Sequence, residues 1–171
     1  MVSPLITLSL SQAALKVGDR LPDFKVRAAT QTDLVDFSTA DALGKGPVVW
    51  AFYPLAFTSV CTAEVCELRD TLGRFSELNA RVYGVSIDTP QTNRIFAQKE
   101  NLNFPLVSDP NREMVPKFGI VADMVAGVKH VAKRAVYVSD SEGRIVYAWV
   151  SEDPKARPDF EQVRAALRNA K

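Results

Sequence analysis

Two cysteines, Cys61 and Cys66, are the only thiols in the chain of 171 residues, and His130 is its single histidine. Four residues separate the cysteines, so they form neither the Cys-x-x-Cys pair of a dithiol reductase nor a pair of zinc knuckles. With one histidine, a Cys/His zinc site would lack ligands. Two interpretations remain: redox chemistry at the thiols, or two buried structural thiols that do no chemistry.

Cys61 lies at the junction between a predicted strand and a predicted helix. Residues 47–53 form a continuous apolar run, typical of a strand buried on both faces, and the run stops at Pro54. Residues 62–78 place apolar side chains at three- and four-residue steps, which predicts an amphipathic helix. With Thr58 as the N-cap, Cys61 falls in the first turn, where free N–H groups and the helix dipole favour an anion. The location therefore predicts a reactive thiolate.

The other predicted elements place this junction in an α/β fold. Strands alternate with helices along most of the chain, and the turn formers at 140–143 predict a hairpin. We expect a mixed central β-sheet flanked by helices, with the junction at its carboxyl edge, where active sites of open α/β folds lie. The predicted strands are 24–27, 34–37, 82–87, 104–107, 135–138 and 144–150, and the predicted helices are 90–100, 109–119 and a closing helix capped by Asp159.

Length and charge narrow the class of protein. The length favours one domain, residues 1–171, with residues 1–15 as an N-terminal extension. The 21 basic and 20 acidic side chains leave a formal charge of +1, which argues against nucleic acid or anionic membrane as a partner. No apolar run reaches the roughly 18 residues of a membrane span. Residues 1–15 carry no charge and so lack the basic region of a secretory signal. We expect an extra strand or a packed arm there, and a cytoplasmic protein.

The sequence around Cys61 resembles the active-site signature of the peroxiredoxins, thiol peroxidases built on a thioredoxin-like fold. Pro54, Thr58 and Cys61 form the pattern Pro-x-x-x-Thr-x-x-Cys. The similarity extends over residues 16–150 and includes the segments 18–24, 84–88, 104–109 and 134–138. The resemblance implies a thioredoxin-like fold and peroxidase activity on hydrogen peroxide and organic hydroperoxides. Nothing in the sequence implies a metal, flavin or nucleotide cofactor.

The resemblance also implies a role for each site residue. Cys61 corresponds to the peroxidatic cysteine, whose thiolate attacks one peroxide oxygen and becomes a sulfenic acid. Thr58 directs its hydroxyl at the peroxide, and Arg134 supplies a guanidinium to both the thiolate and the substrate. The backbone N–H groups of Val60 and Cys61 add two donors for the charge that develops on the leaving oxygen. Pro54 shields the thiolate from water.

Some of these side chains have plainer interpretations when they are taken alone. Arg134 would be a solvated arginine at the end of a strand. Glu64 and Arg69 would form an exposed pair on one helix, although the resemblance suggests supporting roles for both. His130 is expected at the surface without a role.

Cys66 stands five residues after Cys61, where the Q-type (bacterioferritin-comigratory) peroxiredoxins often place a resolving cysteine. The resemblance thus implies an internal disulfide, which thioredoxin or a similar dithiol protein reduces in turn. On an ideal helix, Cα atoms five residues apart are separated by about 8 to 9 Å. A disulfide needs a Cα separation of about 4.4 to 6.8 Å. We therefore predict that the first turns of the helix unwind on oxidation.

Alternative functions stay open at this point. Residues 54–58 also resemble the AhpE-like one-cysteine branch, in which an external thiol resolves the sulfenic acid. A peroxide sensor or redox-switched binding protein would use the same oxidation to change shape, and a thioredoxin-like domain with inert thiols would not use it at all. Q-type relatives suggest a monomer, and AhpE-like relatives suggest a homodimer.

Overall fold

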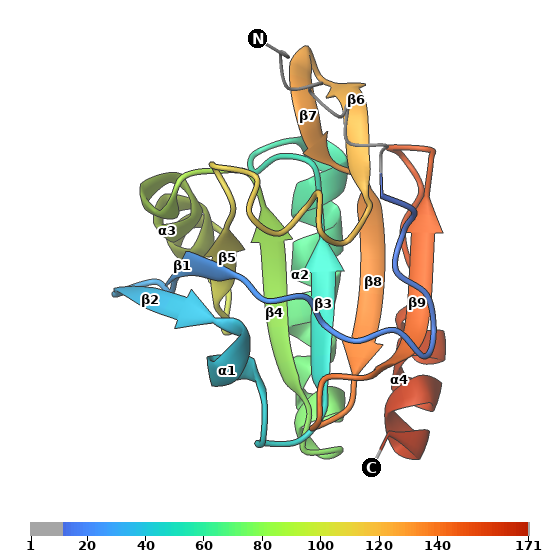
Figure 1. Ribbon diagram of the computed structural model, residues 1–171. Coiled ribbons are helices and arrows are strands. Elements are labelled where there is room, and N and C mark those ends of the chain that lie inside the picture. The colour runs from blue at the N-terminus through green and yellow to red at the C-terminus, as the bar shows by residue number, and fades with distance from the viewer. Residues whose placement is uncertain (1–11, 171) are drawn as a thin grey trace, which may run out of the picture.

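The computed structural model describes residues 12–170, which are organised around a seven-stranded sheet (Figure 1). The strand order is β2-β1-β5-β4-β3-β8-β9. Strands β3, β4 and β5 run parallel, whereas the remaining neighbours pair antiparallel. The predicted mixed sheet of an α/β fold is confirmed. The strands are β1 (Lys25–Ala29), β2 (Leu34–Ser38), β3 (Val48–Phe52), β4 (Arg81–Ser86), β5 (Leu106–Ser108), β8 (Arg134–Ser139) and β9 (Ile145–Ser151).

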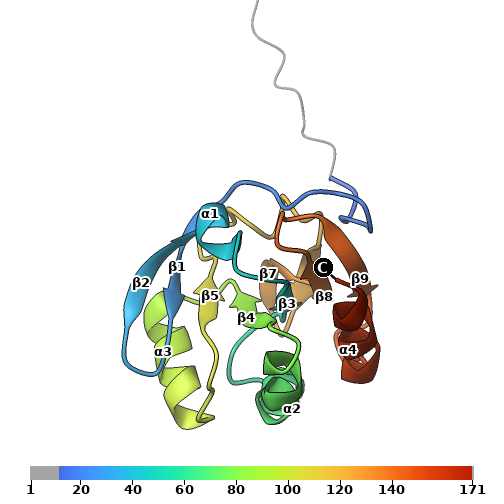
Figure 2. The same ribbon diagram turned by 90° about the horizontal axis from the view of Figure 1, so that it is seen from below.

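The long helices cover one face of the sheet. Figure 2 shows α2, α3 and α4 side by side on that face, with α1 and the irregular N-terminal segment on the other. Strand β3 is buried on both faces, as its apolar run predicts. Val49 and Ala51 belong to the core between the sheet and the long helices. Trp50 and Phe52 belong to the core on the opposite face of the sheet. The helices are α1 (Thr39–Ala42), α2 (Ser59–Ser76), α3 (Pro90–Lys99) and α4 (Phe160–Asn169).

Local capping signals account for where the helices begin. Thr89 precedes α3, its side chain accepts from Thr92 N at 3.2 Å, and Pro90 occupies the first turn. Asp159 caps α4 as predicted, with its carboxylate accepting from Glu161 N at 2.9 Å. Helix α2 begins three residues earlier than residue 62, the start expected from its apolar periodicity.

The predicted helix at 109–119 is wrong, because this segment folds as a series of turns. The Asp109 carboxylate accepts from the backbone N–H groups of Glu113, Met114 and Val115, which ties the chain into a compact loop. Arg112 adopts a φ of 58°, in the left-handed region that interrupts a right-handed helix. The side chain that looks like a helix cap therefore organises a loop instead.

A hairpin that the sequence patterns did not indicate follows this loop. Strands β6 (Val121–Val125) and β7 (Val128–Ala132) pair antiparallel and extend beyond the end of β3 in Figure 1. The two residues between them, Ala126 and Gly127, have φ values of 51° and 79°. Two positive φ values are typical of a type I′ turn, for which Asn-Gly is the usual signal and Ala-Gly is a weak one.

The N-terminal segment is bonded to distant parts of the chain. Leu15 N donates to Phe118 O at 3.0 Å, and Gly18 N donates to Ile145 O at 2.8 Å. Residues 1–11, most of the expected N-terminal extension, lie outside the described residues. Between residues 12 and 170, the structure contains no helix that is long and apolar enough to cross a membrane.

Candidate active site

Cys61 is the third residue of α2 and is buried. Thr58 is the N-cap, and its carbonyl accepts from Thr62 N at 2.9 Å. By helix geometry, the three N–H groups before Thr62, which belong to residues 59–61, have no acceptor within the helix. The positive end of the helix dipole lies at the same place, so the surroundings of the Cys61 sulfur favour negative charge.

Arg134 is the first residue of β8, and it brings a guanidinium directly to the thiol. Its Nη2 donates to Cys61 Sγ at 3.1 Å, and its Nη1 donates to Glu64 Oε2 at 2.5 Å. Its Nε donates to the carbonyl of Pro154. The side chains of Arg134 and Glu64 are both almost fully buried. The arginine is therefore a fixed donor to the sulfur and not the solvated strand-end residue of the plainer interpretation.

Glu64 belongs to the site because it pairs with Arg134. The sequence alone suggested Arg69 as its partner. Burial raises the pKa of Glu64 to about 7, and the adjacent Arg134 opposes that rise. One carboxylate oxygen, Oε2, bonds to Arg134, whereas the buried Oε1 has no partner among the described residues. Glu64 therefore fixes the orientation of the guanidinium.

The loop between β3 and α2 forms the other side of the site. Pro54 is buried, and the Thr58 hydroxyl donates to Leu55 O at 3.2 Å instead of capping the helix. Pro54 and Arg134 together line a cavity of about 360 Å³. The rest of its wall comes from β6, Lys133, Ser151, Glu152 and Pro154. A cavity of this size is large enough for a small hydroperoxide beside the guanidinium.

Cys66 lies one turn further along α2 and is half-buried. Its thiol donates to Glu100 Oε2 at 3.5 Å. Arg69 Nη1 contacts Cys66 Sγ at 3.7 Å and also donates to Glu100 O at 2.6 Å. Burial is the main reason that the pKa of Cys66 is raised, Arg69 opposes the rise, and Glu100 adds to it. The surroundings of Cys66 therefore favour the protonated thiol and tie α2 to the end of α3.

Both cysteines are free thiols on one uninterrupted helix. The helical spacing of about 8 to 9 Å between their Cα atoms exceeds the range of a disulfide. The conformation described here is thus that of the reduced protein, with Cys61 beside Arg134 and Cys66 beside Glu100.

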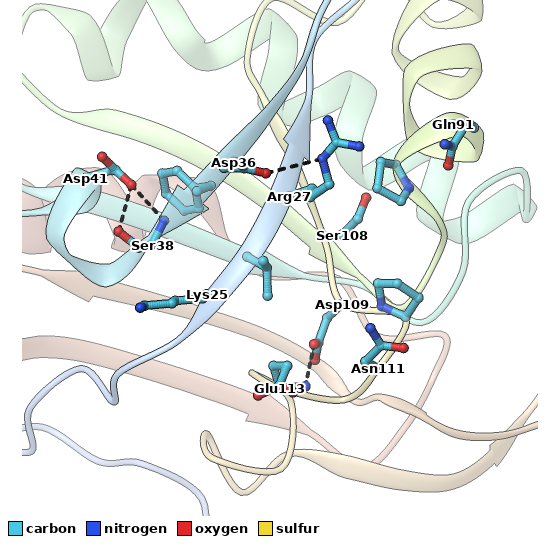
Figure 3. A pocket seen from close by; sticks show the side chains of 14 residues that line it. Lys25, Arg27, Asp36, Ser38, Asp41, Gln91, Ser108, Asp109, Asn111 and Glu113 are labelled. Atoms are coloured by element: carbon cyan, nitrogen blue, oxygen red, sulfur yellow. Dashed lines mark hydrogen bonds and ion pairs between the residues drawn. The ribbon is translucent and has the colours of Figure 1, made fainter.

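A second cavity, of about 770 Å³, lies apart from the thiols (Figure 3). It is bounded by β1, β2, the start of α3 and the loop after β5. Four of its charged side chains are already partnered: Arg27 Nε lies 3.5 Å from Asp36 Oδ1, Asp41 accepts from Ser38, and Asp109 accepts from Glu113 N. This cavity contains neither cysteine and is not part of the thiol site.

A buried cysteine at a helix start, with an arginine on its sulfur and a mixed sheet behind it, is the arrangement of a peroxiredoxin. The chain belongs to the AhpC/TSA family, whose model matches residues 17–148. The chloroplastic 2-Cys peroxiredoxin BAS1 of spinach (Spinacia oleracea) is 32% identical over 142 residues, which are 79% of this chain and 52% of that protein. The chain thus spans about half the length of that relative.

Two mycobacterial proteins match over more of their own length. A Mycobacterium tuberculosis protein named as a peroxiredoxin is 36% identical over 136 residues, which are 78% of this chain and 84% of that protein. The crystal structure of the peroxidoxin BcpB from Mycobacterium tuberculosis superimposes with a TM-score of 0.78 and 30% identity. That match covers 92% of this chain and 99% of BcpB. The predicted thioredoxin-like fold of the peroxiredoxins is confirmed.

Proposed function

We propose that this protein is a thiol-dependent peroxidase that reduces hydrogen peroxide and organic hydroperoxides at Cys61. The observation that carries the proposal is the 3.1 Å contact between Arg134 Nη2 and Cys61 Sγ at the start of α2. A cysteine in this position is held beside a positive charge and beside free backbone donors, and both stabilise the negative charge that develops when its sulfur attacks a peroxide. Membership of the AhpC/TSA family supports the same activity.

In the first step, the Cys61 thiolate attacks one peroxide oxygen, so an S–O bond forms while the O–O bond breaks. Sulfur supplies the two electrons and becomes a sulfenic acid, and the leaving oxygen takes a proton to become water or an alcohol. Arg134 and the N–H groups at the start of α2 stabilise the charge that develops on that oxygen. Thr58 directs its hydroxyl at the bound peroxide, and Pro54 keeps water from the sulfur.

In the second step, the Cys66 thiolate attacks the sulfur of the sulfenic acid. An S–S bond forms, the S–O bond breaks, and the hydroxide that leaves is protonated to water. The helical spacing of the cysteines requires the first turns of α2 to unwind, which releases Cys66 from Glu100 and Arg69. Thioredoxin or a similar dithiol protein then reduces the disulfide.

A one-cysteine route is the second candidate, because the contacts of Cys66 with Glu100 and Arg69 hold it away from Cys61. In that route an external thiol attacks the sulfenic acid of Cys61. The proposal also includes a cytoplasmic location, since two free thiols are typical of a reducing compartment. It includes a monomer or a homodimer, which sedimentation analysis distinguishes.

The test is the intact mass of the reduced protein after one equivalent of hydrogen peroxide, measured without reductant. A loss of about 2 Da indicates the internal disulfide, and a gain of about 16 Da indicates a sulfenic acid that waits for an external thiol. The variant Cys66→Ser should show only the gain, and Cys61→Ser should show neither change. An unchanged mass of the wild-type protein would contradict the peroxidase activity itself.

A further inference from the structure

The loop of residues 54–58 needs contacts outside itself to keep its shape. Phe57, a bulky residue, adopts a φ of 63°, a conformation that backbone sterics disfavour. Its ring packs against Phe96 of α3, with 4.9 Å between the centroids, and Lys99 Nζ lies 5.5 Å from its centroid. These contacts hold the exposed side chain, but they do not fix the backbone that leads from Pro54 to Thr58.

Asp88 supplies a bond to that backbone. Its Oδ2 accepts from Ala56 N at 2.8 Å, and the same oxygen accepts from the Ser86 hydroxyl at 2.8 Å. Ala56 is buried and directly precedes Phe57, so the bond acts at the residue before the disfavoured φ. Asp88 follows β4, which lies beside β3 in the sheet, so it reaches the loop from the neighbouring strand.

The carboxylate of Asp88 is itself held by a buried set of polar groups. The Ser86 hydroxyl lies 3.3 Å from Asn93 Oδ1, and Asn93 Nδ2 donates to Ser108 Oγ at 2.8 Å. The Tyr53 hydroxyl at the end of β3 donates to the same Asn93 Oδ1 at 3.2 Å. Because β3, β4, β5 and α3 all contribute to this set, Asp88 is a rigid support for the loop.

We propose that Asp88 is a positioning residue for the reaction of Cys61 with peroxide. By holding the Ala56 N–H, it fixes the loop between Pro54 and Thr58 and so the place of the Thr58 hydroxyl relative to the sulfur. The peroxide reaction depends on this geometry, because its transition state needs donors aligned with the leaving oxygen. Alkylation of the same thiol by iodoacetamide depends on the thiolate and on access alone. The proposal rests on the proposed peroxidase function.

The experiment compares these two reactions in variants that all carry Cys66→Ser, so that only Cys61 reacts. The second-order rates with hydrogen peroxide and with iodoacetamide are measured by mass spectrometry, together with the Tm. Asp88→Ala removes the acceptor, and Asp88→Asn keeps an uncharged oxygen at the same place. Asp36→Ala is the matched control, because Asp36 is an exposed carboxylate whose ion pair is with Arg27 on the neighbouring strand.

Asp88→Ala should lower the peroxide rate by about 10- to 100-fold while changing the iodoacetamide rate far less. Asp88→Asn should restore most of the peroxide rate, and Asp36→Ala should change neither rate. A lower Tm with an unchanged ratio of the two rates would show a purely structural role and overturn the proposal. So would an Asp88→Asn variant as impaired as Asp88→Ala.

If Asp88→Ala does not fold, Asp88→Glu carries the test, because it keeps the charge but moves the carboxylate by one methylene. A fall in the ratio of the two rates supports the proposal, and an unchanged ratio contradicts it. Failure of the peroxidase function is distinguishable, because the parent protein with Asp88 intact would then not react with peroxide.

Discussion

The guanidinium of Arg134 reaches the sulfur of Cys61 across 73 residues of sequence, with 3.1 Å between Nη2 and Sγ. The contact exists because β8 lies beside β3 in the sheet, with Ala135 opposite Phe52. From the next turn of α2, the carboxylate of Glu64 accepts from the other terminal nitrogen, Nη1. Strand β8 and helix α2 thus hold the guanidinium against the thiol.

Replacing Arg134 should affect catalysis and stability in separable ways. Arg134→Met should lower the rate of the peroxide reaction by about 100-fold or more, because the developing oxyanion loses a donor. It should also destabilise the fold by about 3 to 5 kcal/mol, because Glu64 is left buried without its partner. The double variant Arg134→Met with Glu64→Gln should recover much of the Tm but none of the peroxide rate. Recovery of both would contradict the assignment of Arg134 to the reaction.

Glu64 should make the stability of the fold depend on pH. Its pKa is raised from 4.5 to about 7 by burial, so the folded protein holds this proton more tightly than the unfolded chain does. The stability contributed by the protonated carboxyl is fully present below pH 4.5 and is lost as the pH rises through 7. The wild-type protein should therefore lose about 3 kcal/mol relative to Glu64→Gln between those pH values.

The measurement is the free energy of unfolding by urea at several pH values from 4.5 to 8. Asp70→Asn, a change at an exposed carboxylate on the same helix that pairs with Arg69, is the control and should leave the pH dependence of the wild-type protein in place. If the free energy of unfolding varied with pH in the same way in the wild-type protein and in Glu64→Gln, Glu64 would have the same pKa in the folded and unfolded states, and the prediction would be wrong.

Glu100 should slow the formation of the disulfide. Its carboxylate accepts from the Cys66 thiol and raises the pKa of that thiol, which disfavours the attacking thiolate. Glu100→Gln removes the negative charge, so disulfide formation at pH 7 should be roughly two- to fivefold faster. The control is Glu67→Gln, because Glu67 pairs with Arg157 at 3.1 Å. The rate is followed by the loss of about 2 Da after a peroxide pulse, and equal rates in the two variants would argue against a role for Glu100.

Oxidation should loosen only the first part of α2. We expect the amides of residues 62–67 to exchange with solvent faster in the oxidised than in the reduced protein, because the disulfide cannot form on an intact helix. The later turns carry Leu68 and Phe75, both fully buried, and their protection should stay the same. Unchanged exchange of residues 62–67 would exclude an internal disulfide between the cysteines as the stable product.

The sequence was most informative where the interactions are local. The apolar run of β3, the periodicity of α2 and the caps Thr89 and Asp159 each depend on residues within a few positions of one another. The place of Cys61 in the first turn follows from the same local pattern. These features were predictable because the hydrogen bonds and the burial that cause them depend on neighbouring residues.

Pairings between distant residues were not predictable in this way. The partner of Glu64 is 70 residues away and is fixed by the register of β3 and β8, so the helix sequence alone suggests Arg69 instead. The bond from Ala56 to Asp88 likewise depends on β4 lying beside β3. Local signals also misled at Asp109, whose carboxylate caps the backbone of a loop instead of a helix.

The N-terminal segment forms hydrogen bonds with residues that are synthesised much later. Gly18 N donates to Ile145 O, and Leu21 N donates to Gly143 O, each at 2.8 Å. These residues are synthesised more than 120 residues before their partners. During synthesis, the N-terminal segment therefore cannot cover the core around Trp50 and Phe52 until the start of β9 has been made. The N-terminal segment therefore adds its hydrogen bonds to a core whose seven strands have all been synthesised.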